Sequence, residues 1–240
     1  MPTIMFTAGA KGGTGKSTAI RFLTTYLWKN GHDPLLLDMD DENRTMSRFF
    51  PQATRVEIKK VSSYDILIKK IIAGTNLIVA DLKAGVGRET LQWWLDIPFD
   101  DEALANVSFI CLTSITSSPD SVQSFLNWAS ELKGRVSYVV FKNQKNGDTF
   151  PDFDSSKEAL DFRMSANPIE IDIPLLDAEY MTELERLNLT VSEVLEANGK
   201  DNINGKPVGD ILSDLMVRSR LRRVQDGIYN QLNPILNLIR

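Results

Sequence analysis

Residues 8–18 of this chain read Ala8-Gly9-Ala10-Lys11-Gly12-Gly13-Thr14-Gly15-Lys16-Ser17-Thr18. An apolar run at residues 4–6 precedes this stretch, and a helical pattern of apolar residues follows it between Ile20 and Leu27. A strand, a glycine-rich turn and a helix in this order are the setting of a phosphate-binding loop. Glycines allow successive backbone N–H groups to converge on an anion, and the helix adds its own unpaired N–H donors.

The residues predicted to bind the phosphates follow one another in the chain: Gly12, Gly13, Thr14, Gly15, Lys16, Ser17 and Thr18. Lys16 has the reach and the charge to contact the β- and γ-phosphates, and the Ser17 hydroxyl is placed to hold Mg²⁺. The general pattern G-x-x-x-x-G-K-[ST] is met only at its end, because Ala10 stands where the first glycine is expected.

Residues 11–18, Lys-Gly-Gly-Thr-Gly-Lys-Ser-Thr, resemble the deviant Walker A motif KGGxGK[ST] of the ParA/MinD family of P-loop ATPases. The position before the first lysine is not always glycine in that family, so Ala10 is compatible with the resemblance. The resemblance covers about residues 1–180 and is nearest to plasmid partition and stability ATPases. It implies that ATP is sandwiched in a homodimer, with Lys11 of each subunit reaching the ATP of the other.

Two aspartates follow predicted buried strands: Asp40 comes shortly after residues 34–38, and Asp81 comes directly after residues 76–80. The carboxyl ends of strands form the ligand edge of an open α/β sheet, so both carboxylates are placed for a phosphate-bound Mg²⁺. The resemblance makes Asp40 the hydrolytic switch I aspartate and Asp81 the Walker B aspartate that orders a water on Mg²⁺. The alternative for Asp40 is a solvated acidic loop. The Asp-Glu pair that follows it, instead of the Pro-Gln of partition ATPases, leaves the subfamily open.

The resemblance also suggests where a purine base binds. Asn143 follows the predicted strand at residues 136–141, and in related ATPases an asparagine at this place reads the adenine edge. An ordinary turn asparagine is the alternative. Pro174 ends the last predicted strand, residues 169–173, and resembles the segment that flanks the purine. The polar loop from 142 to 156 is interpreted as either a functional segment or a flexible surface.

Two local patterns give further expectations. Residues 56–60 alternate between apolar and charged side chains, which predicts an edge strand. Trp93 and Trp94 are neighbours on a predicted helix, where adjacent residues point about 100° apart. Only one of the two tryptophans is therefore predicted to be fully buried.

The C-terminal segment carries an apolar helical stripe from Val217 to Ile239, and Pro234 within it should kink or end the helix. Four basic residues lie beside the stripe: Arg218, Arg220, Arg222 and Arg223. Three interpretations stay open. The helix docks on its own sheet with the arginines in solvent, the arginines contact DNA phosphates, or the helix lies on a membrane surface.

Composition bounds the kind of protein. With 240 residues, 42% of them hydrophobic, the chain is predicted to form a single domain over residues 1–240, in which residues 206–240 are a C-terminal helical segment. A net charge of −5 gives no bulk attraction to nucleic acid, so DNA binding requires a local basic patch. The single cysteine, Cys111, and the single histidine, His32, exclude internal disulfides and Cys/His metal sites. No targeting or membrane-spanning pattern is found, and a cytoplasmic location, with nucleoid association as an option, is expected.

Alternating strands and helices around a phosphate loop predict an α/β fold with a doubly wound, mainly parallel sheet and helices on both faces. The resemblance implies a Mg²⁺-ATP-dependent dimerisation switch with slow hydrolysis. Its expected role is plasmid or DNA partition, with nonspecific DNA binding and a ParB-like adaptor protein. The alternative is a MinD-like or conjugation-associated positioning ATPase that acts on a membrane or on protein partners. A metabolic P-loop ligase is a third interpretation, against which Lys11 counts.

Overall fold

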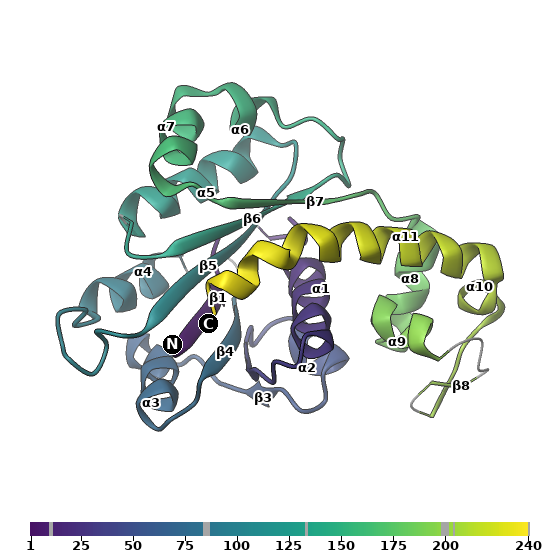
Figure 1. The fold of residues 1–240 in the computed structure, drawn as a ribbon, viewed down its shortest axis with the longest axis horizontal. Coiled ribbons are helices and arrows are strands. Elements are labelled where there is room, and N and C mark those ends of the chain that lie inside the picture. Colours follow the sequence, from purple (N-terminus) through teal and green to yellow (C-terminus); the bar gives the residue numbers. More distant parts are fainter. Residues whose placement is uncertain (10–11, 84–86, 133, 198–201, 204, 240) are drawn as a thin grey trace.

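The computed structural model describes residues 1–9, 12–83, 87–132, 134–197, 202–203 and 205–239. Its centre is a seven-stranded sheet in the order β3-β2-β4-β1-β5-β6-β7, and all neighbouring strands are parallel (Figure 1). The strands are β1 (Thr3–Thr7), β2 (Leu35–Met39), β3 (Thr54–Arg55), β4 (Leu77–Leu82), β5 (Ser108–Ile115), β6 (Ser137–Asn143) and β7 (Ile169–Ile173). The central strands β1 and β4 are buried along their whole length, which explains their nearly continuous apolar sequence.

Helices cover both faces of the sheet, and each face has its own apolar core. One core is shared with α1 (Lys16–Lys29), α2 (Thr45–Phe49), α8 (Ala178–Leu187), α9 (Val191–Glu196), α10 (Asp210–Ser213), α11 (Leu215–Leu232) and the 3₁₀ segment η2 (Asn233–Asn237). The other is shared with the 3₁₀ segment η1 (Val61–Asp65), α3 (Ile66–Ile72), α4 (Gly87–Asp96), α5 (Pro119–Leu132), α6 (Pro151–Ser155) and α7 (Lys157–Ala166). The short strands β8 (Asn202–Ile203) and β9 (Lys206–Pro207) form a separate antiparallel pair. The predicted α/β fold with helices on both faces is confirmed.

The path of the chain explains this division and places the ligand edge. The chain goes from β1 to β2 and β3 on one side of the sheet, and later goes through β4 to β5, β6 and β7 on the other side. Because parallel crossovers are right-handed, reversing the direction moves the connecting helices to the opposite face. The reversal occurs around β1. Ligands of such sheets bind beyond the carboxyl ends of the strands at this point.

The predicted edge strand at residues 56–60 is wrong in its position. The strand that pairs with β2 is Thr54–Arg55. Its pairing ends with a hydrogen bond from the Val56 N–H to the carbonyl oxygen of Asp38, at 2.8 Å. The alternation that suggested a strand has another cause. Val56 and Ile58 pack, partly buried, against the second core while the backbone runs past the end of the sheet.

Both tryptophans of α4 are buried, so the prediction that only one would be is also wrong. Trp94 is 1% exposed and packs on Phe6 of β1, with ring centroids 5.5 Å apart. Trp93 is 3% exposed and packs on Tyr64 of η1 at 5.7 Å. The two side chains do point in different directions, but η1 packs against α4 and covers Trp93.

The segment from 142 to 156 is not a flexible surface throughout. Phe150 and Phe153 are 2% and 0% exposed and belong to the second core, and α6 begins at Pro151. Aromatic packing therefore anchors the second half of this segment to the sheet. Its first half lies at the ligand edge, beside the phosphate loop.

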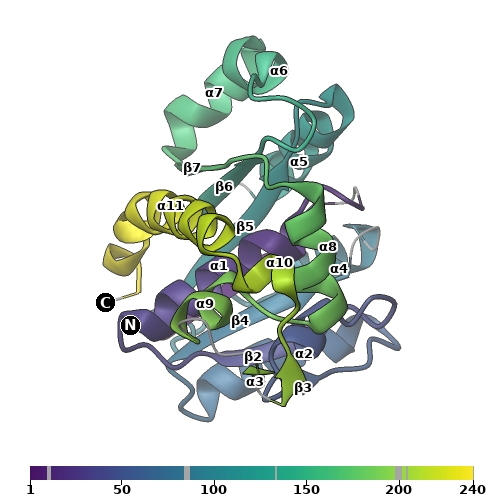
Figure 2. The ribbon, with the colours of Figure 1, turned by 90° about the vertical axis from the view of Figure 1, so that its right-hand side faces the viewer.

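The C-terminal stripe is used inside the fold. Leu221, Ile228 and Leu232 of α11 are fully buried and belong to the first core. There α11 packs against β7, α1 and α9 (Figures 1 and 2). α11 ends at Leu232, and Pro234 lies in η2, as predicted. The interpretation in which this helix docks on its own sheet is confirmed. The stripe is consequently not available to a membrane surface.

Candidate functional site

The phosphate loop leaves β1 at the reversal point and runs into α1. Gly15 precedes α1 with φ of 99°, a left-handed conformation that suits glycine. No side chain caps this end of α1, and its first turn contains no acidic residue. The amino end of a helix offers N–H donors and a partial positive charge, so this terminus is suited to an anion. Ala10 and Lys11 lie outside the described residues.

Lys16, the first residue of α1, lies among carboxylates at the ligand edge. Burial is the largest influence on its amine and lowers its pKa, while Asp81 and Asp40 oppose this effect and favour the charged form. Ser17 and Thr18, the next two residues of α1, are half-buried at the same edge. A cation, two carboxylates and two hydroxyls therefore meet beside the uncapped helix end.

Asp81 belongs to β4 and lies opposite Asp38 of β2 in the sheet register. The Thr7 hydroxyl at the end of β1 donates to Asp81 Oδ1 at 3.1 Å. Asp81 is 3% exposed, and its burial raises its pKa to about 7; the Thr7 hydrogen bond and Lys16 lower it, whereas Asp38 and Asp40 raise it further. The buried carboxylate thus lines the cleft, where it is suited to a nearby cation.

Asp40 is held in a defined orientation by its own loop. Its Oδ1 accepts from the N–H groups of Glu42 and Asn43 at 3.1 and 3.0 Å, and its Oδ2 accepts from Asn43 Nδ2 at 3.1 Å. Asp38 supports this loop, because its carboxylate accepts from the Asp40 N–H at 3.3 Å and from the Ser47 N–H of α2 at 2.7 Å. Asp40 is only 9% exposed, so the alternative of a freely solvated acidic loop does not describe it.

The loop after Asp40 is also tied to the strand that carries Asp81. Lys83 Nζ forms ion pairs with Asp41 at 3.0 Å and Glu42 at 2.9 Å. These two acidic residues are the ones that depart from the Pro-Gln of partition ATPases. They link the segment after β2 to the segment after β4, a connection that sequence reasoning did not find.

An open cleft of about 420 Å³ joins these groups. Its lining includes most of the predicted site: Gly12, Gly13, Gly15, Lys16, Ser17, Thr18, Asp40, Asp81, Asn143 and Pro174. Thr14, which is not part of this lining, is buried within the loop. The cleft continues past Pro174 to Leu176, Met181 and Glu185 of the α8 region. The cleft therefore runs from the phosphate loop to α8.

The residues fit a Mg²⁺ ion that a nucleotide brings with it. Among the described residues, no group of three or more His, Cys, Asp and Glu side chains could hold a metal by itself. Mg²⁺ in phosphate-transfer sites is commonly held by one or two carboxylates, a hydroxyl, water and phosphate oxygens. Ser17, Asp81 and Asp40 have the donor groups that would supply that protein share.

Asn143 lies at the phosphate loop as well as at the cleft. It is 7% exposed, and its Nδ2 donates to the carbonyl oxygen of Thr14 at 3.0 Å. Two of its neighbours at the loop were not singled out from the sequence. The Ser114 hydroxyl donates to the same Thr14 oxygen at 2.8 Å, and Lys145 Nζ donates to the carbonyl oxygen of Gly13. No local sequence pattern points to these contacts, because they join segments more than 90 residues apart.

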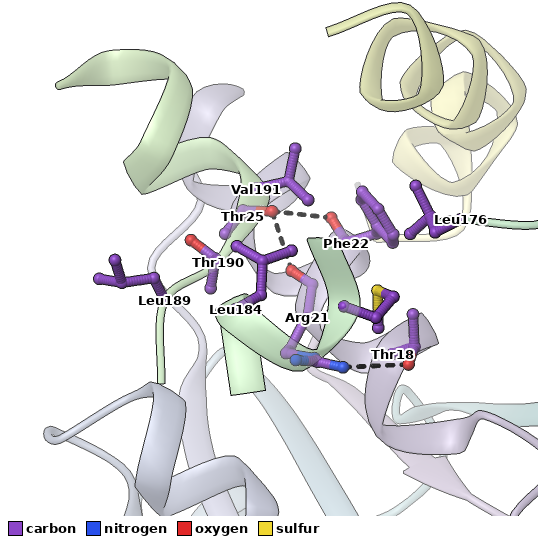
Figure 3. A pocket seen from close by; sticks show the side chains of 10 residues that line it. Thr18, Arg21, Phe22, Thr25, Leu176, Leu184, Leu189, Thr190 and Val191 are labelled. Carbon is purple, nitrogen blue, oxygen red and sulfur yellow. Dashed lines mark hydrogen bonds between the residues drawn. The ribbon is translucent and has the colours of Figure 1, made fainter. Parts of the chain in front are cut away.

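A small apolar pocket lies behind the cleft, between α1 and α8–α9 (Figure 3). Arg21 crosses its wall and donates to Thr18 Oγ1 at 3.0 Å. The Arg21 side chain is 9% exposed, pairs with Glu185 of α8 at 2.9 Å, and lies over the Phe49 ring at 4.1 Å. Arg21 thus connects the helix of the phosphate loop to α2 and α8.

The predicted arginine cluster lies apart from the cleft, on α11. Arg218 donates to the carbonyl oxygen of Leu195, and Arg220 donates to the Tyr180 hydroxyl at 2.6 Å. Arg220, Arg222 and Arg223 are exposed, whereas Arg218 is half-buried. Three of the four arginines are therefore available to a partner.

Residues 3–92 match the family described as ATPase MipZ, a span that contains the phosphate loop, Asp40 and Asp81. MinD cell division protein from Aquifex aeolicus is 15% identical, with 99% of this chain and 97% of that chain covered and a TM-score of 0.55. In the MinC:MinD cell division protein complex from the same organism, the matched chain is 14% identical, with 99% and 96% covered and a TM-score of 0.57.

A plasmid partition protein from Borrelia burgdorferi B31 bound to AMPPNP is 14% identical, with 93% of this chain and 98% of that chain covered and a TM-score of 0.48. No curated protein matches the sequence significantly. At these identities, the structural neighbours with the higher TM-scores establish the P-loop NTPase fold. Together with the family match, they confirm the predicted resemblance to ParA/MinD-type P-loop ATPases.

None of the described helices combines enough length with enough hydrophobicity to cross a membrane.

Proposed function

From this likeness to ParA/MinD-type P-loop ATPases, we propose that the chain binds Mg²⁺-ATP, dimerises around it and hydrolyses it slowly. One observation carries the proposal: a single cleft brings the uncapped end of α1 together with Lys16, Asp40 and Asp81. An uncapped helix end with a lysine attracts phosphates, and the two carboxylates attract the accompanying cation. Catalysis of phosphoryl transfer needs little beyond such positioning and charge neutralisation.

Each residue has a role in this proposal. The loop N–H groups and Lys16 bind the phosphates, while Ser17 and Asp81 hold Mg²⁺, which neutralises phosphate charge when bound. Asp40 orients the attacking water, for which its fixed carboxylate is well prepared. Lys11 of one subunit neutralises phosphate charge in the other. ATP turnover to ADP then separates the dimer.

The base is proposed to lie at the far end of the cleft, beside Pro174. The adjoining wall consists of Leu176 and Met181, which are apolar and suit the face of a purine. Asn143 lies between this end and the phosphate loop.

We expect the ATP-bound dimer to bind DNA nonspecifically, and to work with an adaptor protein of the ParB kind. Arg220, Arg222 and Arg223 on the solvent side of α11 support this proposal, because exposed guanidinium groups can pair with phosphates without base contacts. The alternative is a positioning ATPase that acts on protein partners. A membrane-bound form would need a segment other than α11, whose apolar stripe lies in the core.

Light scattering with size exclusion on an Asp40→Ala variant tests the switch. This variant should bind ATP but not turn it over, so it should be a dimer with Mg²⁺-ATP and a monomer with ADP. Lys11→Ala added to this background should remove the dimer. A mass that is the same in both nucleotides would contradict the proposed switch.

Binding to random-sequence duplex DNA tests the proposed role of the exposed arginines of α11. The ATP dimer should bind it with an affinity that falls steeply as salt increases. Replacing Arg220, Arg222 and Arg223 by alanine should abolish binding and keep the dimer. The matched control removes the same charge elsewhere, through Lys59→Ala, Lys70→Ala and Lys157→Ala. Equal loss in both triple variants would argue for a general charge effect, and a dimer that ignores DNA would favour the protein-positioning alternative.

A further inference from the structure

One side of the phosphate loop is held by side chains from the β5–β6 half of the sheet, and two of them, Asn143 and Lys145, also line the cleft. Ser114 comes from β5, Asn143 ends β6, and Lys145 follows in the next turn. The carbonyl oxygen of Thr14 accepts from Ser114 Oγ at 2.8 Å and from Asn143 Nδ2 at 3.0 Å. A carbonyl oxygen has two lone pairs, so these two donors together satisfy it. Lys145 Nζ donates a hydrogen bond to the neighbouring carbonyl oxygen, that of Gly13.

The carbonyl contacts determine where the loop N–H groups point. In a planar trans peptide, the C=O and the following N–H are directed to opposite sides. Because the Gly13 carbonyl is held toward Lys145, the Thr14 N–H is directed away from Lys145. Because the Thr14 carbonyl is held toward Ser114 and Asn143, the Gly15 N–H is directed away from these two side chains. Successive backbone N–H groups held in a fixed direction are the donors that a phosphate-binding loop uses.

The loop needs external support because of its composition. Gly13 and Gly15 have φ of 72° and 99°, and glycine loses more conformational freedom than any other residue when it is ordered. The approach of Asn143 is so close that a Cβ added to Gly15 would lie 2.0 Å from Nδ2. Glycine at this position therefore permits both the backbone conformation and the contact.

The amide of Asn143 is engaged at both ends. Its Oδ1 accepts from the Lys145 N–H at 3.1 Å, while its Nδ2 donates to Thr14. Asn143 and Ser114 are 7% and 4% exposed, so these hydrogen bonds are shielded from water. This arrangement orients the amide toward the loop backbone, which differs from an amide held ready to read a base.

We propose that Ser114, Asn143 and Lys145 form a clamp that holds the phosphate loop in its anion-binding shape before a nucleotide arrives. The three are positioning residues, because they act through the Gly13 and Thr14 backbone. A preformed loop spends less free energy on ordering when the ligand binds, which increases affinity. This inference rests on the proposed nucleotide function and replaces the base-reading role of Asn143 with a phosphate-loop role.

Calorimetric titration of the full chain with Mg²⁺-ATP, Mg²⁺-GTP and Mg²⁺-tripolyphosphate tests the clamp. Tripolyphosphate has no base, so it separates the two roles. The affinities for ATP and for tripolyphosphate should fall by the same factor, roughly tenfold, in each of three variants: Asn143→Ala, Ser114→Ala and Lys145→Met. The preference for ATP over GTP should not change. Lys145→Arg should recover most of the affinity, and the exposed matched control Lys157→Met should bind like the unaltered chain.

Thermal melting of the nucleotide-free variants distinguishes this role from a general loss of structure. The melting temperatures of Ser114→Ala and Lys145→Met should lie within a few degrees of that of the unaltered chain. The clamp is overturned if Asn143→Ala weakens ATP but leaves tripolyphosphate unchanged, because the amide would then read the base. It is also overturned if none of the variants changes any affinity. An unaltered chain that binds none of the three ligands would instead contradict the proposed nucleotide function, and the clamp with it.

Discussion

Asp81 shows, at the scale of one residue, that the cleft is built at the expense of stability. The side chain lies on a central strand at 3% exposure, and burial is the main reason that its pKa rises to about 7. A carboxylate that is hard to ionise without a cation nearby is useful for holding Mg²⁺ and unfavourable in its absence. Such conflicts between function and stability are common at binding sites.

Asp81→Asn is therefore expected to stabilise the nucleotide-free protein, measured without Mg²⁺. The native pKa is higher than that of the unfolded chain, so the native state holds a proton that the unfolded state loses between about pH 4 and pH 7. Stability of the unaltered chain falls across this window as the pH rises. The gain in melting temperature from Asp81→Asn should be largest above pH 7 and shrink toward pH 4. The exposed control Asp33→Asn should show no such trend, and a pH-independent gain would contradict the buried titration.

At the scale of elements, three helices that each follow a segment lining the cleft are joined by ion pairs. α1 follows the phosphate loop, α2 follows the Asp40 loop, and α8 follows Pro174. Arg21 of α1 and Arg48 of α2 both pair with Glu185 of α8, at 2.9 and 3.2 Å. Burial lowers the pKa of Arg21, and Glu185 opposes this effect by stabilising its charge. The ion pairs thus hold the three segments in a fixed relation.

Glu185→Ala is expected to lower the free energy of unfolding by about 2 kcal/mol, because it leaves the buried Arg21 charge without its carboxylate. The value is below that of a fully buried pair, since Glu185 is 39% exposed. Arg48→Ala is the matched control. Arg48 is 42% exposed, and its loss leaves the Arg21–Glu185 pair intact, so it should cost less than about 1 kcal/mol. Urea unfolding measures the free energy of unfolding of both variants. Equal losses would show that the Arg21–Glu185 pair stabilises the fold no more than the exposed Arg48–Glu185 pair does.

At the scale of the whole molecule, the chain returns across its own sheet to finish the first core. α11 lies over β7 and beside α1, the helix of the phosphate loop (Figure 2). The Tyr229 hydroxyl of α11 donates to Thr25 of α1 at 2.9 Å, and the Tyr26 hydroxyl of α1 donates to Asn233 at 2.8 Å. The C-terminal segment therefore supports the helix that carries the proposed nucleotide site.

Ile228→Ala should consequently lower the free energy of unfolding of the whole chain by about 3 kcal/mol, because it opens a cavity at a fully buried position of α11. Arg222→Ala on the exposed side should change it by less than about 0.5 kcal/mol. Chemical unfolding followed by tryptophan fluorescence measures the difference. A small effect of Ile228→Ala would mean that α11 is only loosely attached to the core.

Several parts of the fold could be predicted because their causes are local. A strand–glycine turn–helix pattern identified the phosphate loop, and unbroken apolar runs identified the central parallel strands. The ends of these runs located Asp40 and Asp81, because parallel strands bring their carboxyl ends to one edge. Pro174 could be placed for the same reason.

Other parts could not be predicted, because they depend on segments that only the fold brings together. Trp93 is buried by η1, whose position over α4 is not visible in the helical period. Val56 and Ile58 alternate as a strand would, but no partner strand remains for them at the edge of the sheet. The stripe of α11 was compatible with three surfaces until its neighbours were known.

The amino-acid sequence by itself determined the fold class, the phosphate loop and the carboxylates at the strand ends, because periodicity and glycine conformation act over a few residues. Only the tertiary structure decided what surrounds them. Ser114, Asn143 and Lys145 reach the loop from about 100 to 130 positions away along the chain, and Glu185 reaches Arg21 from a different helix. Such contacts are set by the packing of the sheet and its helices, since hydrogen bonds and ion pairs depend on distance in space.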